Sequence, residues 1–174
     1  RQYGRSMDAQ LGSYFTRVDT DLFDSSQFTM GPWDPRHQHG GPPSALLGCS
    51  IDAAFPREFM QVVRVSVEIL GPVPVGRLLV KTATERRGRS GELLSGSLID
   101  VDANREVLRA TMVRVRTQDI GGEVPVEDVL PPGPEGIERW DAGLPGDSYL
   151  KALDLRFSSG GFSDKGTGAA WARR

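Results

Sequence analysis

The sequence predicts an α+β domain in which one helix packs against a long antiparallel sheet, and three observations predict it. The stretch from about Gln61 to Thr117 divides into segments of strand length that are separated by turn residues. One segment of helix length, almost free of charged residues, precedes that stretch. The connections between the strand segments are too short to hold crossover helices, which favours antiparallel neighbours.

The sheet prediction starts from residues 61–70. From Val63 to Ile69 every second residue is apolar, a period of two that is typical of a strand with one buried face. Glycine and proline then end this strand, and the short connections beyond it predict an antiparallel meander. Three further strands are predicted over residues 78–86, 92–102 and 106–117. Two weaker strand candidates precede the helix, at residues 13–19 and 27–30.

The helix is predicted to begin at Pro42 or Pro43 and to end before Pro56. Proline is tolerated in the first helical turn because the N–H that it lacks would have no intrahelical partner there. Asp52 is the only charged residue between these prolines. A helix that is apolar nearly all round is buried on most sides, so we expect the sheet to enclose it and Cys49 to lie in the core.

The chain divides by composition into three parts. Residues 8–118 are predicted to form the domain just described, and residues 119–148, rich in proline, glycine and acidic residues, are predicted to be a linker. Residues 149–174 hold two more strand candidates, at 149–157 and 169–171. Because a lone hairpin is marginally stable, these strands either open a second domain or add edge strands to the first sheet.

Composition narrows the class of partner. The 174 residues carry a net charge of -2, which argues against nucleic acid as a partner, since phosphate binding usually shows as a basic excess. A single cysteine, Cys49, excludes an intrachain disulfide and favours a reducing compartment, so we expect a cytoplasmic protein. No apolar run approaches the length that spans a bilayer, and residues 1–7 do not resemble a secretion signal.

The candidate site is the segment that leads into the helix. His39 is followed there by Gly40 and Gly41. A helix N-terminus presents N–H groups without partners and a partial positive charge, and glycine lets a ligand approach the backbone closely. A carbonyl oxygen that gains negative charge at this point would be stabilised as in an oxyanion hole. The other interpretation, a tight loop before a helix, remains equally open on these residues alone.

Several neighbouring side chains are candidates for the same site. His39 is a candidate acid–base group or hydrogen-bond donor, and Asp34, the nearest carboxylate, is a candidate base. Trp33 either packs over the helix start or walls a ligand pocket. Arg89, in an arginine-rich turn, is a candidate phosphate clamp, although a solvated turn is the simpler interpretation. His37 and His39 are too few ligands for a metal, and no metal or cofactor is expected.

At this point the sequence resembles a known family. Residues 39–47, His-Gly-Gly-Pro-Pro-Ser-Ala-Leu-Leu, resemble the entry to the central helix of hot-dog thioesterases, in which an antiparallel sheet wraps around one helix. Residues 65–76 and 85–90 are similar to a strand–turn–strand of the TesB-like acyl-CoA thioesterases, which carry two hot-dog repeats in one chain. Residues 168–173 resemble the first strand of their second repeat.

The resemblance implies an acyl-CoA substrate and a second hot-dog unit, either in the same chain or in a homodimer. Gly40, Gly41, Trp33 and Arg89 then become candidate substrate-binding residues, and Arg89 would contact the phosphates of CoA. The catalytic residues of TesB-like enzymes lie in the second repeat, so none is carried over to this chain.

Three functions remain open from the sequence. The first is an acyl-CoA thioesterase that hydrolyses a fatty-acyl thioester to free acid and CoA. The second is an enoyl-CoA hydratase of the MaoC type, because Asp34 lies five positions before His39; it requires both side chains in one pocket. The third is a non-catalytic acyl or acyl-CoA binding module. It is favoured by Gly48, which stands where single-domain thioesterases of this type carry a carboxylate.

Overall fold

The computed structural model describes residues 13–119, 121–122, 133–141, 143 and 146–173. One α-helix, α1, runs from Gly41 to Ala54, and a short 3-10 helix, Gln27–Thr29, precedes it. The described strands are β1 (Phe15–Arg17), β2 (Leu22–Ser25), β3 (Met60–Ile69), β4 (Arg77–Arg87), β5 (Gly91–Asp100), β6 (Arg105–Arg116), β7 (Asp154–Ser159) and β8 (Ala169–Arg173).

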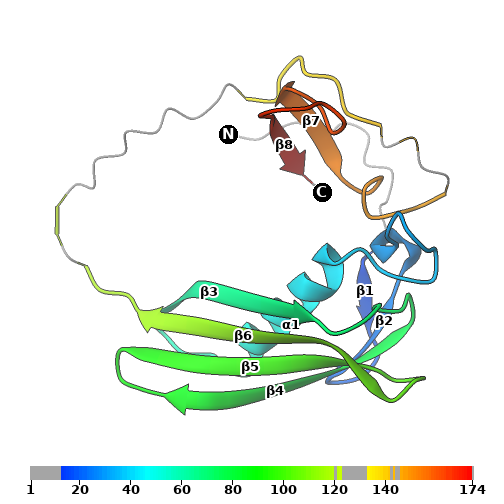
Figure 1. The fold of residues 1–174 in the computed structure, drawn as a ribbon. Helices are drawn as coiled ribbons and strands as arrows, with labels where there is room; N and C mark the ends of the chain where they lie inside the picture. The colour runs from blue at the N-terminus through cyan, green and yellow to red at the C-terminus, as the bar shows by residue number, and fades with distance from the viewer. Residues whose placement is uncertain (1–12, 120, 123–132, 142, 144–145, 174) are drawn as a thin grey trace.

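Six strands form one antiparallel sheet in the order β1-β2-β4-β5-β6-β3, and α1 lies against one face of it (Figure 1). The helix contacts β4, β5 and β6, the middle of the sheet. Strands β7 and β8 pair with each other in a separate two-stranded sheet. The predicted α+β class, one helix on a long antiparallel sheet, is confirmed.

The predicted meander is correct for β4, β5 and β6 and wrong for β3. Strand β3 pairs with β6, where Val65 lies opposite Met112, while β2 takes the free edge of β4, where Leu22 lies opposite Leu79. Alternation of apolar residues indicates which face of a strand is buried, but it does not determine which other strand pairs with it. The connection from β3 to β4 therefore crosses the end of the sheet, where the carbonyl oxygen of Val73 accepts a hydrogen bond from the Gln38 N–H at 2.8 Å.

Three local predictions also need correction. Strand β2 was not predicted, and residues 27–30 form a helical turn because both the N–H and the hydroxyl of Thr29 donate to the Ser26 carbonyl, at 3.0 and 2.7 Å. The strand predicted over 149–157 is displaced: β7 begins at Asp154. The residues before it form a turn in which the Ala152 N–H donates to the Ser148 carbonyl at 3.0 Å.

The core lies between α1 and the sheet. Leu47 and Ile51, one helical turn apart, are fully buried against the middle strands. Gly96 of β5 makes this approach possible, because a Cβ atom there would lie 2.8 Å from Ile51 Cγ1 and 3.0 Å from Leu47 Cδ1. The other buried apolar residues are Phe23, Val73, Leu78, Val80, Leu94, Leu98, Val107, Leu108, Ala110 and Met112.

The helix is buried on one face only, which corrects the prediction of burial on most sides. Cys49, expected in the core, is exposed, because the described residues cover only the side of α1 that carries Leu47 and Ile51. Strand β3 is open in the same way. Val65 and Val67 lie opposite core residues of β6 and so share the helix-side face, yet they remain 41% and 37% exposed.

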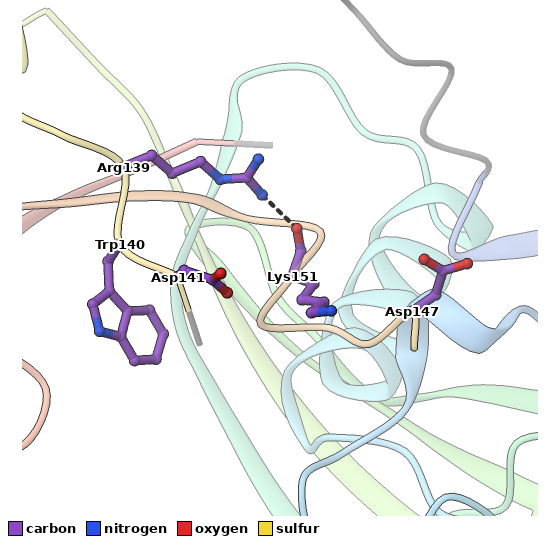
Figure 2. Close-up of a pocket in the computed structure, with 5 residues that line it drawn as sticks. All are labelled: Arg139, Trp140, Asp141, Asp147 and Lys151. Atoms are coloured by element: carbon purple, nitrogen blue, oxygen red, sulfur yellow. Dashed lines mark hydrogen bonds between the residues drawn. The ribbon is translucent and has the colours of Figure 1, made fainter. Parts of the chain in front are cut away.

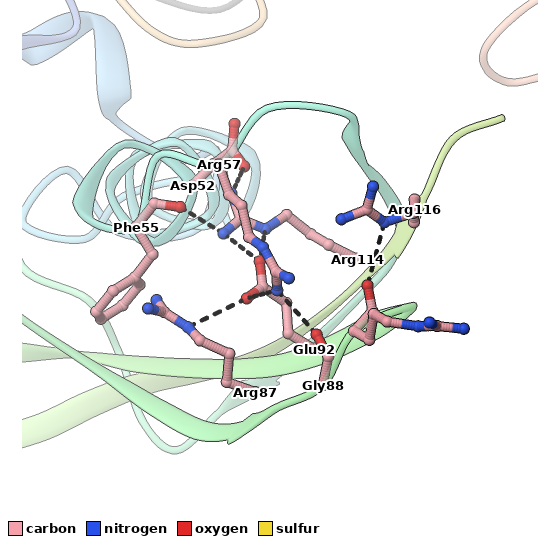
Figure 3. Close-up of polar contacts among 9 residues, drawn as sticks. Asp52, Phe55, Arg57, Arg87, Gly88, Glu92, Arg114 and Arg116 are labelled. Carbon is pink, nitrogen blue, oxygen red and sulfur yellow. Dashed lines mark hydrogen bonds and ion pairs between the residues drawn. The ribbon is translucent and has the colours of Figure 1, made fainter.

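A buried ion pair ties the C-terminal end of α1 to the sheet (Figure 3). Glu92 of β5 and Arg114 of β6 have side chains that are 0% and 3% exposed, and their closest atoms lie 2.6 Å apart. The same guanidinium donates to Asp52 Oδ1 at 2.8 Å and to the Phe55 carbonyl at 2.5 Å. Arg57 approaches the second oxygen of Glu92 at 3.3 Å.

Candidate functional site

The loop that leads into α1 is held on both sides by backbone hydrogen bonds. Met30 and Gln38 form an isolated antiparallel bridge, and the Gly31 N–H donates to the His37 carbonyl at 2.9 Å. The side-chain amide of the buried Gln38 donates to the Pro74 carbonyl at 2.7 Å, which joins the loop to the β3–β4 crossover. The loop therefore delivers His39 to the N-terminal end of the helix in a defined position.

The helix entrance offers fewer hydrogen-bond donors than a typical helix N-terminus. Pro42 and Pro43 occupy the first turn and have no N–H, and the Ser44 N–H donates to the Gly40 carbonyl at 3.3 Å. The Gly41 N–H donates to Nδ1 of His39 at 3.2 Å. Among the described residues the Gly40 N–H has no partner, so it is the backbone donor that remains for a ligand.

His39 is held between two aromatic rings. Its imidazole stacks on Tyr149, with ring centroids 4.5 Å apart, and on Trp33 at 6.0 Å. Burial lowers the pKa of His39 below its ordinary value of 6.5, so the ring is neutral at pH 7. Because Nδ1 accepts the hydrogen bond from Gly41, the proton of the neutral ring lies on Nε2. His39 is therefore arranged as a hydrogen-bond donor.

Asp34 does not join His39. Its carboxylate accepts hydrogen bonds from the Arg36 side chain, at 2.8 Å to Oδ2, and from the Arg36 backbone N–H at 2.9 Å. These bonds hold the pKa of Asp34 well below its usual range, with His37 Nδ1 a further 3.6 Å contact. A carboxylate stabilised in this way is a weak base, and no contact between it and His39 is present in the described part of the chain.

The remaining predicted residues lie apart from one another. Trp33 stacks on His39, directly before the helix start, and is itself 81% exposed. Arg89 is exposed in the β4–β5 turn beside the C-terminal end of α1, where its carbonyl accepts a bond from Arg116. A 14-residue helix is about 21 Å long, so Arg89 and Gly40 lie at opposite ends of it. A Cβ atom at Gly48 would meet no atom within 4 Å.

A cavity of about 370 Å³ is lined by residues 139–141 and by residues 147 and 151, on either side of Tyr149 (Figure 2). Its walls are mostly charged, and Arg139 closes one side by donating to the Lys151 carbonyl at 2.5 Å. None of the residues that the sequence singled out contributes to it. The lining residues are Arg139, Trp140, Asp141, Asp147 and Lys151.

Sequence reasoning missed Tyr149 as a site residue. It lies 110 positions after His39, in a segment that was predicted to be a strand, and no local pattern connects the two. The described residues hold no cluster of three or more histidine, cysteine, aspartate or glutamate side chains that would suit a metal ion. None of the described helices combines the length and apolarity that are needed to cross a membrane.

One α-helix on a six-stranded antiparallel sheet of this order defines a hot-dog protein. The family model of acyl-CoA thioesterase N-terminal domains matches residues 29–115, half of the chain, and the chain belongs to this family. The predicted membership of the thioesterase superfamily is confirmed. No curated protein matches the chain.

Two solved structures support the fold. A conserved hot-dog protein of unknown function from Alicyclobacillus acidocaldarius is 18% identical, with a TM-score of 0.68 over 91% of this chain and 59% of its own. A candidate thioesterase II from Thermobifida fusca YX is 22% identical, with a TM-score of 0.62 over 83% of this chain and 52% of its own. The chain thus spans little more than half the length of either protein.

Proposed function

We propose that this chain is the N-terminal hot-dog unit of an acyl-CoA thioesterase, which hydrolyses a fatty-acyl thioester to the free acid and CoA. The observation that carries the proposal is the helix entrance of a member of the acyl-CoA thioesterase family, where the Gly40 N–H lacks a partner and the neutral imidazole of His39 is fixed as a donor. Both groups suit a thioester carbonyl oxygen.

The proposed reaction is addition followed by elimination. The oxygen of a water molecule bonds to the carbonyl carbon while a base removes its proton, and the carbonyl oxygen becomes negatively charged. The Gly40 N–H and His39 Nε2–H would donate to that oxygen, where charge develops in the transition state. The C–S bond then breaks, the electron pair leaves with sulfur, and the thiolate of CoA takes up a proton.

Among the described residues, neither candidate position supplies a free carboxylate as the base at the helix entrance. The carboxylate of Asp34 is hydrogen-bonded to Arg36, and Gly48 carries no side chain at the helical position where the resemblance to single-domain thioesterases implies a carboxylate. We propose that a second hot-dog unit, in cis or in a homodimer, provides the carboxylate. Two observations support a second unit: β3 is an edge strand with exposed valines, and this chain matches only 59% and 52% of the two similar structures.

The domain boundaries belong to the same proposal. Residues 8–118 would form the first hot-dog unit and 119–148 the linker, and 149–174 would begin the second unit. In support, β7 and β8 form a sheet of their own and add no edge strand to the first sheet. We also propose that the substrate is an acyl-CoA, that the protein is cytoplasmic, and that Trp33 and Arg89 contact the substrate.

One alternative function is supported by a specific observation. Open space at Gly48 favours a non-catalytic acyl-CoA binding module, in which the helix entrance holds the carbonyl group without turnover. The enoyl-CoA hydratase has no such support, because it requires Asp34 and His39 together and the carboxylate of Asp34 is directed to Arg36.

The test is hydrolysis of acyl-CoA thioesters, from short to long chains, by the longest expressed form of the protein. Released thiol is the readout, corrected for the exposed Cys49 with a C49S background. We expect H39A to lower kcat/KM by about 100-fold, the typical effect of losing one oxyanion donor, and H37A, from the same loop, to change it little. Saturable binding of acyl-CoA without release of thiol would support the binding module instead. If the protein shows no binding and no release, both functions are overturned.

A further inference from the structure

Tyr149 contacts the helix entrance from a distant part of the chain. Its ring lies 4.5 Å from the imidazole of His39, centroid to centroid, at an interplanar angle of 24°. Its hydroxyl group lies over Gly41, where an added Cβ atom would approach it to 3.0 Å. The absence of a side chain at position 41 therefore leaves room for the tyrosine ring.

Two adjacent residues, Thr29 and Met30, anchor the backbones of His39 and Tyr149. The His39 N–H donates to the Thr29 carbonyl at 2.7 Å, and the Tyr149 N–H donates to the next carbonyl, that of Met30, at 3.0 Å. The turn that carries Tyr149 is packed against the rest of the protein, because two of its residues, Ser148 and Ala152, are only 2% and 1% exposed. The stacking is therefore set by two adjacent anchor points.

We infer that Tyr149 is a positioning residue for His39: it holds the imidazole plane so that Nδ1 keeps its bond from Gly41 and Nε2 faces the ligand as a donor. This inference rests on the proposed function. Rotation of the ring about its side-chain bonds would break the 3.2 Å bond to Nδ1, which decides which nitrogen carries the proton. Stacking on a rigid neighbour restricts that rotation.

The surroundings make Tyr149 the main cover of the imidazole. Trp33 stacks on the ring from a greater distance and is itself 81% exposed, so it shields little. The nearest carboxylate on the loop, Asp34, is paired with Arg36 and His37. Burial is the cause of the lowered pKa of His39, which fits a ring covered by a neutral aromatic side chain.

The test compares Y149A, Y149F and W33A by NMR of the histidine side chains. The chain has two histidines, so H37Q assigns the signals. In the wild type and in Y149F we expect the Nε2–H form of His39 and a lowered pKa. In Y149A we expect the two tautomers to mix and the pKa to rise toward 6.5, with W33A close to wild type.

Kinetics separates this inference from the proposed function. In an active enzyme we expect Y149A to lower kcat by about 10- to 100-fold with a smaller effect on KM, and Y149F to restore it. An unchanged kcat in folded Y149A, or the same tautomer and pKa as wild type, would overturn the positioning role alone. An inactive wild type would instead overturn the proposed function.

Discussion

Two glycines that look alike in the sequence stand in opposite surroundings. Gly96 lies in β5 directly under the helix, where a Cβ atom would meet Ile51 Cγ1 at 2.8 Å and the Lys81 carbonyl oxygen at 2.9 Å. Gly48 lies within α1 and faces open space. A backbone oxygen does not move aside as a flexible side chain does, so the two positions should respond to alanine with opposite sign.

We predict that G96A destabilises the fold by about 1–3 kcal/mol, because the helix and the sheet have to separate. G48A should stabilise it by about 0.5–1 kcal/mol, because alanine is the better residue in a helix interior. Urea unfolding of both variants checks the pair. A destabilising G48A would mean that this face of the helix is covered in solution.

At the residue scale, sequence reasoning located the helix entrance but not its chemistry. The pattern from His39 to Pro43 placed the loop and the helix start within one residue of where they lie. That Gly41 donates to His39, and that Tyr149 stacks on it, depends on contacts that the sequence does not encode locally. Cys49 was misplaced because hydrophobicity says how much of a helix is apolar, not how much of it one sheet can cover.

At the scale of the elements, the position of α1 depends on an ion pair at one end of the helix. Arg114 connects β6 to Glu92 of β5 and to the last turn of the helix through Asp52 and the Phe55 carbonyl. Two buried charges are costly unless each is fully paired, and here every bond of the guanidinium is directed at an oxygen of the helix or the sheet. The pair therefore specifies how the helix end meets the sheet.

We predict that R114M destabilises the protein by about 3–5 kcal/mol, because Glu92 would remain buried without its closest partner. The double variant R114M/E92M should be destabilised less, since it removes both buried charges and leaves only partners that reach solvent, Asp52, Arg57 and Arg87. R109M, which breaks the exposed pair with Glu106, serves as the control and should have little effect. Chemical denaturation measures all three; equal losses in R114M and R109M would contradict the role given to the buried pair.

The strands show what patterning encodes and what it omits. The ends of β4, β5 and β6 were predicted within a few residues because glycine, proline and asparagine mark the turns. The pairing of β3 with β6 was not predicted, because the alternation from Val65 to Ile69 suits either neighbour. Strand β2 was missed because its four residues, two of them polar, are too short to show a period.

At the scale of the whole molecule, several ionisable groups respond to acid in the same direction. Hydrogen bonds from arginine side chains lower the pKa values of Asp24, Asp34, Glu106 and Asp154, and burial lowers that of His39. For each group the unfolded chain binds protons at a higher pH than the folded one. The stability of the fold is therefore highest at pH values above the pKa values of these groups in the unfolded chain, and it falls as the pH drops below them.

We predict two steps in a plot of Tm against pH. The first, due to His39, begins as the pH falls below 6.5, and the second, due to the carboxylates, begins near 4.5 to 3.8. Thermal unfolding between about pH 8 and pH 3 measures both. H39Q should remove the first step and leave the second; a first step that survives in H39Q would assign it to another group.

The exposed thiol of Cys49 has a practical consequence. The sequence contains no other cysteine, and this one lies on the side of α1 that the described residues leave uncovered. A single maleimide dye therefore attaches at one known point, without any engineered site. Its labelling rate and emission would then report, in real time, whether another surface comes to rest on the helix.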